Sequence, residues 1–75
     1  MNRYIATFYS HFGALTYYKA LREMDIAAKP APVPRNVSSS CGTCVRYEHY
    51  EFIDLDDCEL DGIYLEDELT LVVKK

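Results

Sequence analysis

The chain has 75 residues, of which 49% are hydrophobic and 27% are charged, and twelve acidic against eight basic side chains leave a net charge of −4. This composition predicts a single globular domain over residues 1–75 and excludes a disordered chain and a two-domain enzyme. The acidic balance argues against nucleic acid as a partner, because binding to phosphates depends on Lys and Arg. The apolar runs of the chain are far shorter than the roughly 20 residues that span a membrane, and no signal peptide is recognised. We therefore expect a cytoplasmic protein.

The first third of the chain predicts a strand followed by a helix. Residues 4–9 are rich in aromatic and β-branched side chains, which is typical of a buried strand. Ser10 is expected to cap a helix over residues 11–24, in which apolar side chains recur every three or four positions. Gly13 is expected to cost the first turn of this helix about 1 kcal/mol relative to alanine.

A polar loop separates two further predicted strands. Residues 26–33 indicate a strand at a sheet edge, because Pro30 and Pro32 have no N–H group to donate to a neighbouring strand. The loop covers residues 34–42. Residues 43–50 then alternate between apolar and polar side chains, which predicts a half-buried strand.

The last third of the chain is acidic. Residues 54–68 predict a short helix or an irregular loop, and residues 69–73 predict a final strand. The order β-α-β-β-(α)-β predicts an α+β sandwich of the ferredoxin-like type, an antiparallel sheet with helices on one face. The first two strands then run parallel with the third between them, which places the helix start at Ser10 and His11 beside the loop of residues 34–42.

The segment around Cys41 predicts a reactive thiol. Gly42 is expected to allow a backbone conformation that other residues resist. The N–H groups of Ser39, Ser40 and Cys41 are expected to turn toward the sulfur. A nearby Arg35 and the positive end of the helix dipole would also favour the thiolate, which is the reactive form. The predicted site is therefore Cys41, supported by Arg35, Ser38, Ser39, Ser40, Gly42, Ser10 and His11.

Three short elements of the chain follow one another in order: Phe8-Tyr9-Ser10 before a helix that carries Ala14 and Leu21, then Pro32-Val33-Pro34-Arg35, then Ser38-Ser39-Ser40-Cys41-Gly42. In this pattern, over about residues 4–48, the chain resembles the selenium/sulfur (Se/S) carrier protein-like family of small bacterial and archaeal proteins. It departs from the family at Cys44 and in the acidic segment after Tyr50.

The resemblance implies that Cys41 holds sulfur or selenium as a persulfide or selenosulfide. It implies a carrier without turnover of its own, which needs no cofactor and no metal. Its partners would be the proteins that donate and accept the chalcogen.

Other interpretations of the cysteines remain open. Cys41 and Cys44 form a C-x-x-C motif, which would make Cys44 a second thiol in a redox pair, although a strand and not a helix is predicted to follow. A zinc site could use Cys41, Cys44, His49 and Cys58. Cys58 lies among acidic residues that would raise its pKa, and we expect it to be an unreactive core residue.

A different class of function is a small interaction or regulatory module whose cysteines are incidental. Its edge strand at residues 26–33 and its acidic segment would make the contacts. An exposed edge strand would also allow a homodimer.

Overall fold

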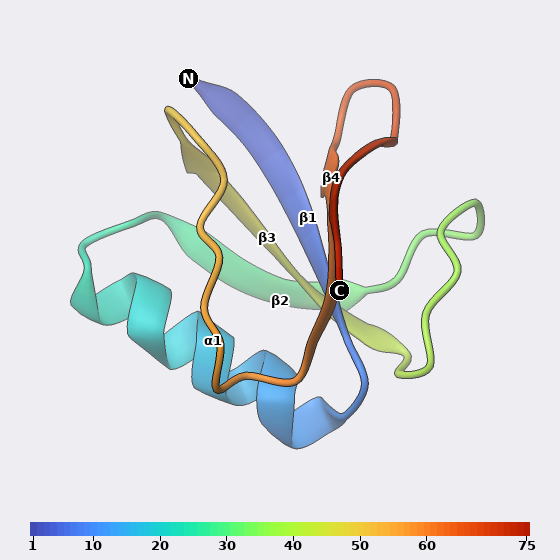
Figure 1. The fold of residues 1–75 in the computed structure, drawn as a ribbon. Coiled ribbons are helices and arrows are strands. Elements are labelled where there is room, and N and C mark those ends of the chain that lie inside the picture. The colour runs from blue at the N-terminus through green and yellow to red at the C-terminus, as the bar shows by residue number, and fades with distance from the viewer.

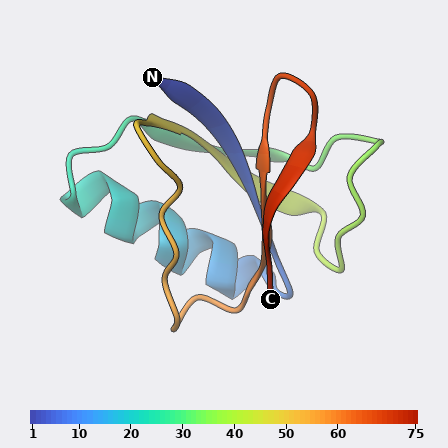
Figure 2. The same cartoon turned by 45° about the horizontal axis from the view of Figure 1, so that its top comes forward.

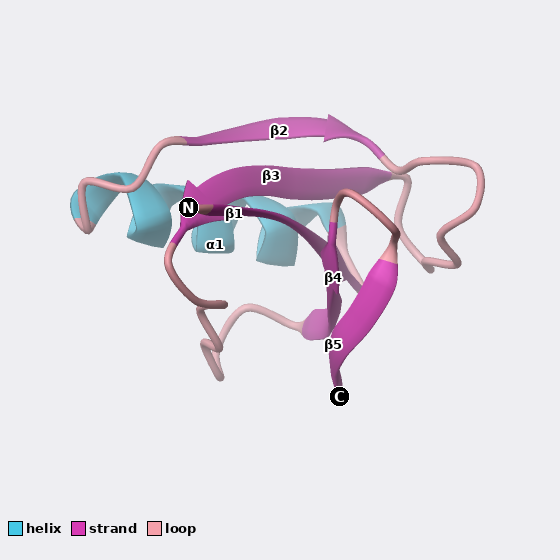
Figure 3. Cartoon of the chain, turned by 90° about the horizontal axis from the view of Figure 1, so that it is seen from above, coloured by secondary structure: helices cyan, strands magenta, loops and turns pink.

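The computed structural model describes all of residues 1–75 and shows a five-stranded antiparallel sheet with one helix packed against it (Figure 1). The elements are β1 (Asn2–Phe8), α1 (His11–Glu23), β2 (Ala28–Pro32), β3 (Thr43–His49), β4 (Leu60–Leu65) and β5 (Thr70–Lys74). The strand order is β2-β3-β1-β4-β5, so β1 and β2 run parallel with β3 between them, as predicted. Seen from above, α1 lies along the β2–β3–β1 part of the sheet, and the β4–β5 hairpin turns away from it (Figure 3).

The predicted helix and edge strand are confirmed. The Ser10 hydroxyl caps α1 by accepting the N–H of Gly13 at 3.0 Å. β2 lies at one edge of the sheet. At the two ends of β2, the Ala27 carbonyl accepts the Glu48 N–H and the Val33 N–H donates to the Gly42 carbonyl. In an antiparallel ladder only alternate residues direct their backbone groups at the neighbouring strand, so the backbone groups of Pro30 and Pro32 point away from β3. Neither proline therefore removes a hydrogen bond from the sheet.

The ferredoxin-like prediction is only partly right, because the second helix is absent and there is an additional strand. Residues 50–59 form an irregular segment, and residues 60–65, predicted as part of a helix or loop, form β4 between β1 and β5. The acidic Asp61 lies buried in this strand because the Lys74 ammonium binds its carboxylate at 2.7 Å. The architecture is therefore a small α+β fold with a single helix.

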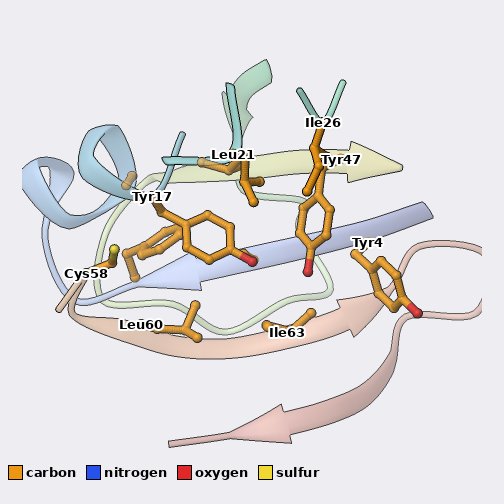
Figure 4. Close-up of a cluster of buried hydrophobic side chains, with 12 residues drawn as sticks. Tyr4, Tyr17, Leu21, Ile26, Tyr47, Cys58, Leu60 and Ile63 are labelled. Atoms are coloured by element: carbon orange, nitrogen blue, oxygen red, sulfur yellow. The ribbon is translucent and has the colours of Figure 1, made fainter. Parts of the chain in front are cut away.

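A cluster of aromatic side chains fills the space between α1 and the sheet (Figure 4). The rings of Tyr17 and Tyr47 lie 5.9 Å apart, and those of Phe8 and Tyr17 lie 5.1 Å apart. The Tyr17 hydroxyl donates to the Ile53 carbonyl at 2.6 Å, and the Ile53 N–H donates to the Tyr47 hydroxyl at 3.1 Å. These two bonds satisfy both backbone groups of Ile53, so the irregular segment before β4 can cover the core without a helix.

Removing the Tyr17 hydroxyl tests this arrangement. Burial raises the pKa of Tyr17 above its usual value of 10.0, so the group remains a donor at neutral pH. We predict that Tyr17→Phe lowers the free energy of unfolding by about 1–3 kcal/mol, because the Ile53 carbonyl loses its donor. Urea unfolding measures the loss. Tyr18→Phe is the control, since the Tyr18 hydroxyl makes no hydrogen bond in the structure, and an equal effect of both variants would contradict the account.

Gly13 is required by close packing and not by its backbone conformation. A Cβ atom added at Gly13 would overlap the carbonyl oxygen of Cys58. The general preference for alanine over glycine in a helix therefore does not apply at this position. The segment that leads into β4 can approach α1 only because residue 13 has no side chain.

We predict that Gly13→Ala lowers the free energy of unfolding by about 3 kcal/mol, the upper end of the usual cost of overpacking. Gly42→Ala is the matched control. A Cβ atom at Gly42 meets nothing within 4 Å, and the φ angle of Gly42 is not positive. Gly42→Ala should therefore change the free energy of unfolding by no more than about 0.5 kcal/mol. A Gly13→Ala protein that is as stable as the Gly42→Ala protein in thermal unfolding would refute the packing argument.

No helix of the structure combines the length and the apolar character needed to cross a membrane.

Candidate functional site

The loop that carries Cys41 is anchored at its base and in its middle. At the base, the Val33 N–H donates to the Gly42 carbonyl at 3.1 Å and extends the pairing of β2 with β3. In the middle, Val37 is only 6% exposed, and its N–H donates to the Pro34 carbonyl at 3.1 Å. Figure 2 shows the loop extending beyond the ends of both strands. Cys41 therefore lies at the rim of the sheet, just before β3 begins.

Two contacts connect this loop region to the junction of β1 and α1. The Ser39 hydroxyl donates to the Phe8 carbonyl at 3.4 Å. The Nδ1 atom of His11 lies 3.2 Å from the Thr43 hydroxyl oxygen. The predicted position of the helix start beside the loop is thus confirmed, although about 30 residues separate the two segments along the chain.

Cys41 is partly exposed, and its sulfur accepts one backbone hydrogen bond. The Thr43 N–H donates to Sγ of Cys41 at 3.4 Å. The Cys41 N–H donates to the Ser39 hydroxyl at 3.3 Å and is therefore not directed at the sulfur, contrary to our prediction. Thr43 is the site residue that the sequence analysis missed. Cys41 and Thr43 are two residues apart, as in the local turns in which a polar side chain accepts the backbone N–H of the residue two positions later.

The other predicted supporting residues differ in what they contact. Ser38, Ser40 and Arg35 are exposed, and their side chains make no hydrogen bond or ion pair in the structure. The Ser10 hydroxyl accepts the Gly13 N–H and donates to the carboxylate of Glu59, so its observed contacts are those of a helix cap.

Gly42 does not use the conformational freedom that a glycine would allow at this position. No glycine of the chain has a positive φ. A Cβ atom at Gly42 would extend into open space, so neither sterics nor backbone strain requires a glycine there.

The other two cysteines lie inside the fold. Cys44 is completely buried, and its thiol donates to the Pro32 carbonyl at 3.5 Å. Burial raises the pKa of Cys44 more than the adjacent Arg46 lowers it. Cys58 is 4% exposed, and burial, assisted by the charge of Asp57, raises its pKa as predicted. Both are therefore poor nucleophiles in the folded protein.

The structure does not support the zinc or dithiol interpretations. No group of three or more His, Cys, Asp or Glu side chains is arranged to hold a metal ion. All three cysteines are free thiols, and the burial of Cys44 separates it from the solvent that reaches Cys41.

Comparison with known families connects this site to a described group of proteins. A family model with the description "Putative Se/S carrier protein-like" matches residues 3–58. The chain belongs to this family. The match covers β1 from Arg3 onward, α1, β2, the Cys41 loop and β3, and it ends at Cys58, before β4. Every predicted site residue of this Se/S carrier-like protein lies within the matched range. The curated proteins and the solved structures contain no match to the chain.

Proposed function

We propose that the protein carries sulfur or selenium on Cys41 between a donor protein and an acceptor protein. The Cys41 thiolate attacks the outer sulfur of a persulfide on the donor. A new S–S bond forms on Cys41, the S–S bond of the donor breaks, and the donor cysteine leaves as a thiolate. One neutral sulfur atom moves, so no external oxidant or reductant is consumed. Attack on a selenium atom by the same route would give a selenosulfide.

The observation that carries this proposal is the difference in exposure among the three thiols. Cys41 is partly exposed at the rim, whereas Cys44 and Cys58 are buried. The Thr43 N–H at 3.4 Å from Sγ of Cys41 can stabilise negative charge on the sulfur. A carrier needs an accessible sulfur and a surface for its partners, and it needs no enclosed substrate pocket. A chain of 75 residues can supply both.

The same mechanism accounts for the proposed absence of catalysis and cofactor. The carrier ends each cycle with its own thiol restored, and the chemistry that extracts the chalcogen belongs to the donor. We propose the cytoplasm as its location, because its thiols remain reduced there.

Mass spectrometry after incubation with a cysteine desulfurase and cysteine tests the proposal. We predict a mass increase of one sulfur atom on the wild-type protein, reversed by a thiol reductant. Cys41→Ser should abolish the increase. The matched control is Cys58→Ala, which should be loaded like the wild type, provided that circular dichroism shows a folded protein. Sulfur that remains on the Cys41→Ser protein at the wild-type level would show that Cys41 is not the carrier residue.

A further inference from the structure

The charges of the chain are divided unequally along its length. Residues 1–35 contain five basic and two acidic side chains, a net charge of +3, whereas residues 36–75 contain three basic and ten acidic ones, a net charge of −7. Four basic side chains have no carboxylate within 4.0 Å, and all four come from the first part: Lys19, Arg22, Lys29 and Arg35. An acidic protein thus retains a group of unpaired cations, two of which lie on α1.

One face of α1 combines these cations with exposed apolar side chains. Phe12, Leu15, Lys19 and Arg22 are spaced by three, four and three residues, so they form one stripe along the helix. All four are exposed, and Phe12 is 75% exposed although it is one of the largest apolar side chains of the chain. The core uses the opposite face, with Ala14, Tyr17 and Leu21. The core therefore does not use the Phe12 side chain, which is free to contact another molecule.

The apolar end of this stripe lies next to the Cys41 loop. His11, which precedes Phe12, contacts Thr43, and the Thr43 N–H binds the Cys41 sulfur. A protein that contacts Phe12 and Leu15 is thus brought to the rim at which Cys41 is partly exposed. Large aromatic side chains are frequent anchors of protein interfaces, and surrounding charges guide the approach of a partner.

We propose that the Phe12–Leu15–Lys19–Arg22 stripe is the docking surface for the persulfide-bearing donor protein. The donor would present an apolar depression beside its sulfur-bearing cysteine and carboxylates farther along, opposite Lys19 and Arg22. This inference rests on the proposed carrier function. It adds that loading from a protein requires the stripe, whereas loading from a small sulfur compound does not.

Loading of Cys41 from two sources tests the surface. The protein donor is a cysteine desulfurase supplied with cysteine, and the small donor is inorganic polysulfide, which transfers one sulfur atom and leaves as a shorter polysulfide. We expect Phe12→Ser and Lys19→Glu each to reduce the rate of loading from the desulfurase by about tenfold or more. Loading from polysulfide should be unchanged, and added salt should slow only the reaction with the desulfurase.

The chain provides a matched control for each variant. Tyr50→Ser removes an aromatic side chain that is 73% exposed outside the stripe, and Lys29→Glu reverses an unpaired cation on β2. Both controls should load from the desulfurase at the wild-type rate.

Two results would overturn the docking surface. In one, the stripe variants load from the desulfurase as fast as their controls. In the other, the wild type loads from polysulfide but not from the desulfurase. The carrier function itself fails only if Cys41 of the wild type is loaded by neither source, so the two failures can be distinguished.

Discussion

The pairing of β3 with both β1 and β2 determines where Cys41 lies. β1 and β2 have to run parallel because each is antiparallel to β3, so α1 begins and the Cys41 loop begins at the same end of the sheet. The register pairs Cys44 with Thr7 and Thr43 with Pro32, which places Cys41 just outside the ladder. A shift of one residue would exchange the two faces of β3 and turn Val45 and Tyr47 away from the core that α1 covers.

The three cysteines show how position determines the chemistry of one residue type. Cys44 points from a central strand into a fully buried site, and Cys58 packs beneath the helix start where Gly13 leaves room for its backbone. Their burial keeps both thiols protonated at neutral pH. Cys41 alone combines access to solvent with a backbone donor, the Thr43 N–H. The fold therefore leaves Cys41 as the one cysteine within reach of solvent and buries the other two.

Local signals in the sequence were sufficient for the first half of the fold and for the final strand, whereas contacts distant in sequence decided the segment between them. The period of α1, the alternation of β3 and the prolines of β2 predict those elements, and their order predicts the helix start beside the loop. β4 was missed because an acidic residue and a glycine interrupt its pattern, and only the pairing of Asp61 with Lys74 makes that strand acceptable. The Tyr17–Ile53 bond and the Gly13–Cys58 contact also join distant segments. At the site, Cys41 and its neighbourhood were predicted, but the donor to the sulfur depends on the loop backbone, which composition does not determine.

Competitive alkylation of the folded protein measures whether Cys41 is selectively accessible among the three cysteines. A limiting amount of iodoacetamide at neutral pH, followed by peptide mapping, gives the relative rate for each cysteine. We predict that Cys41 reacts first and that Cys44 and Cys58 react only after the protein is unfolded. A Cys41 that is protected in the folded protein, or that reacts no faster than the two buried thiols, would contradict this prediction.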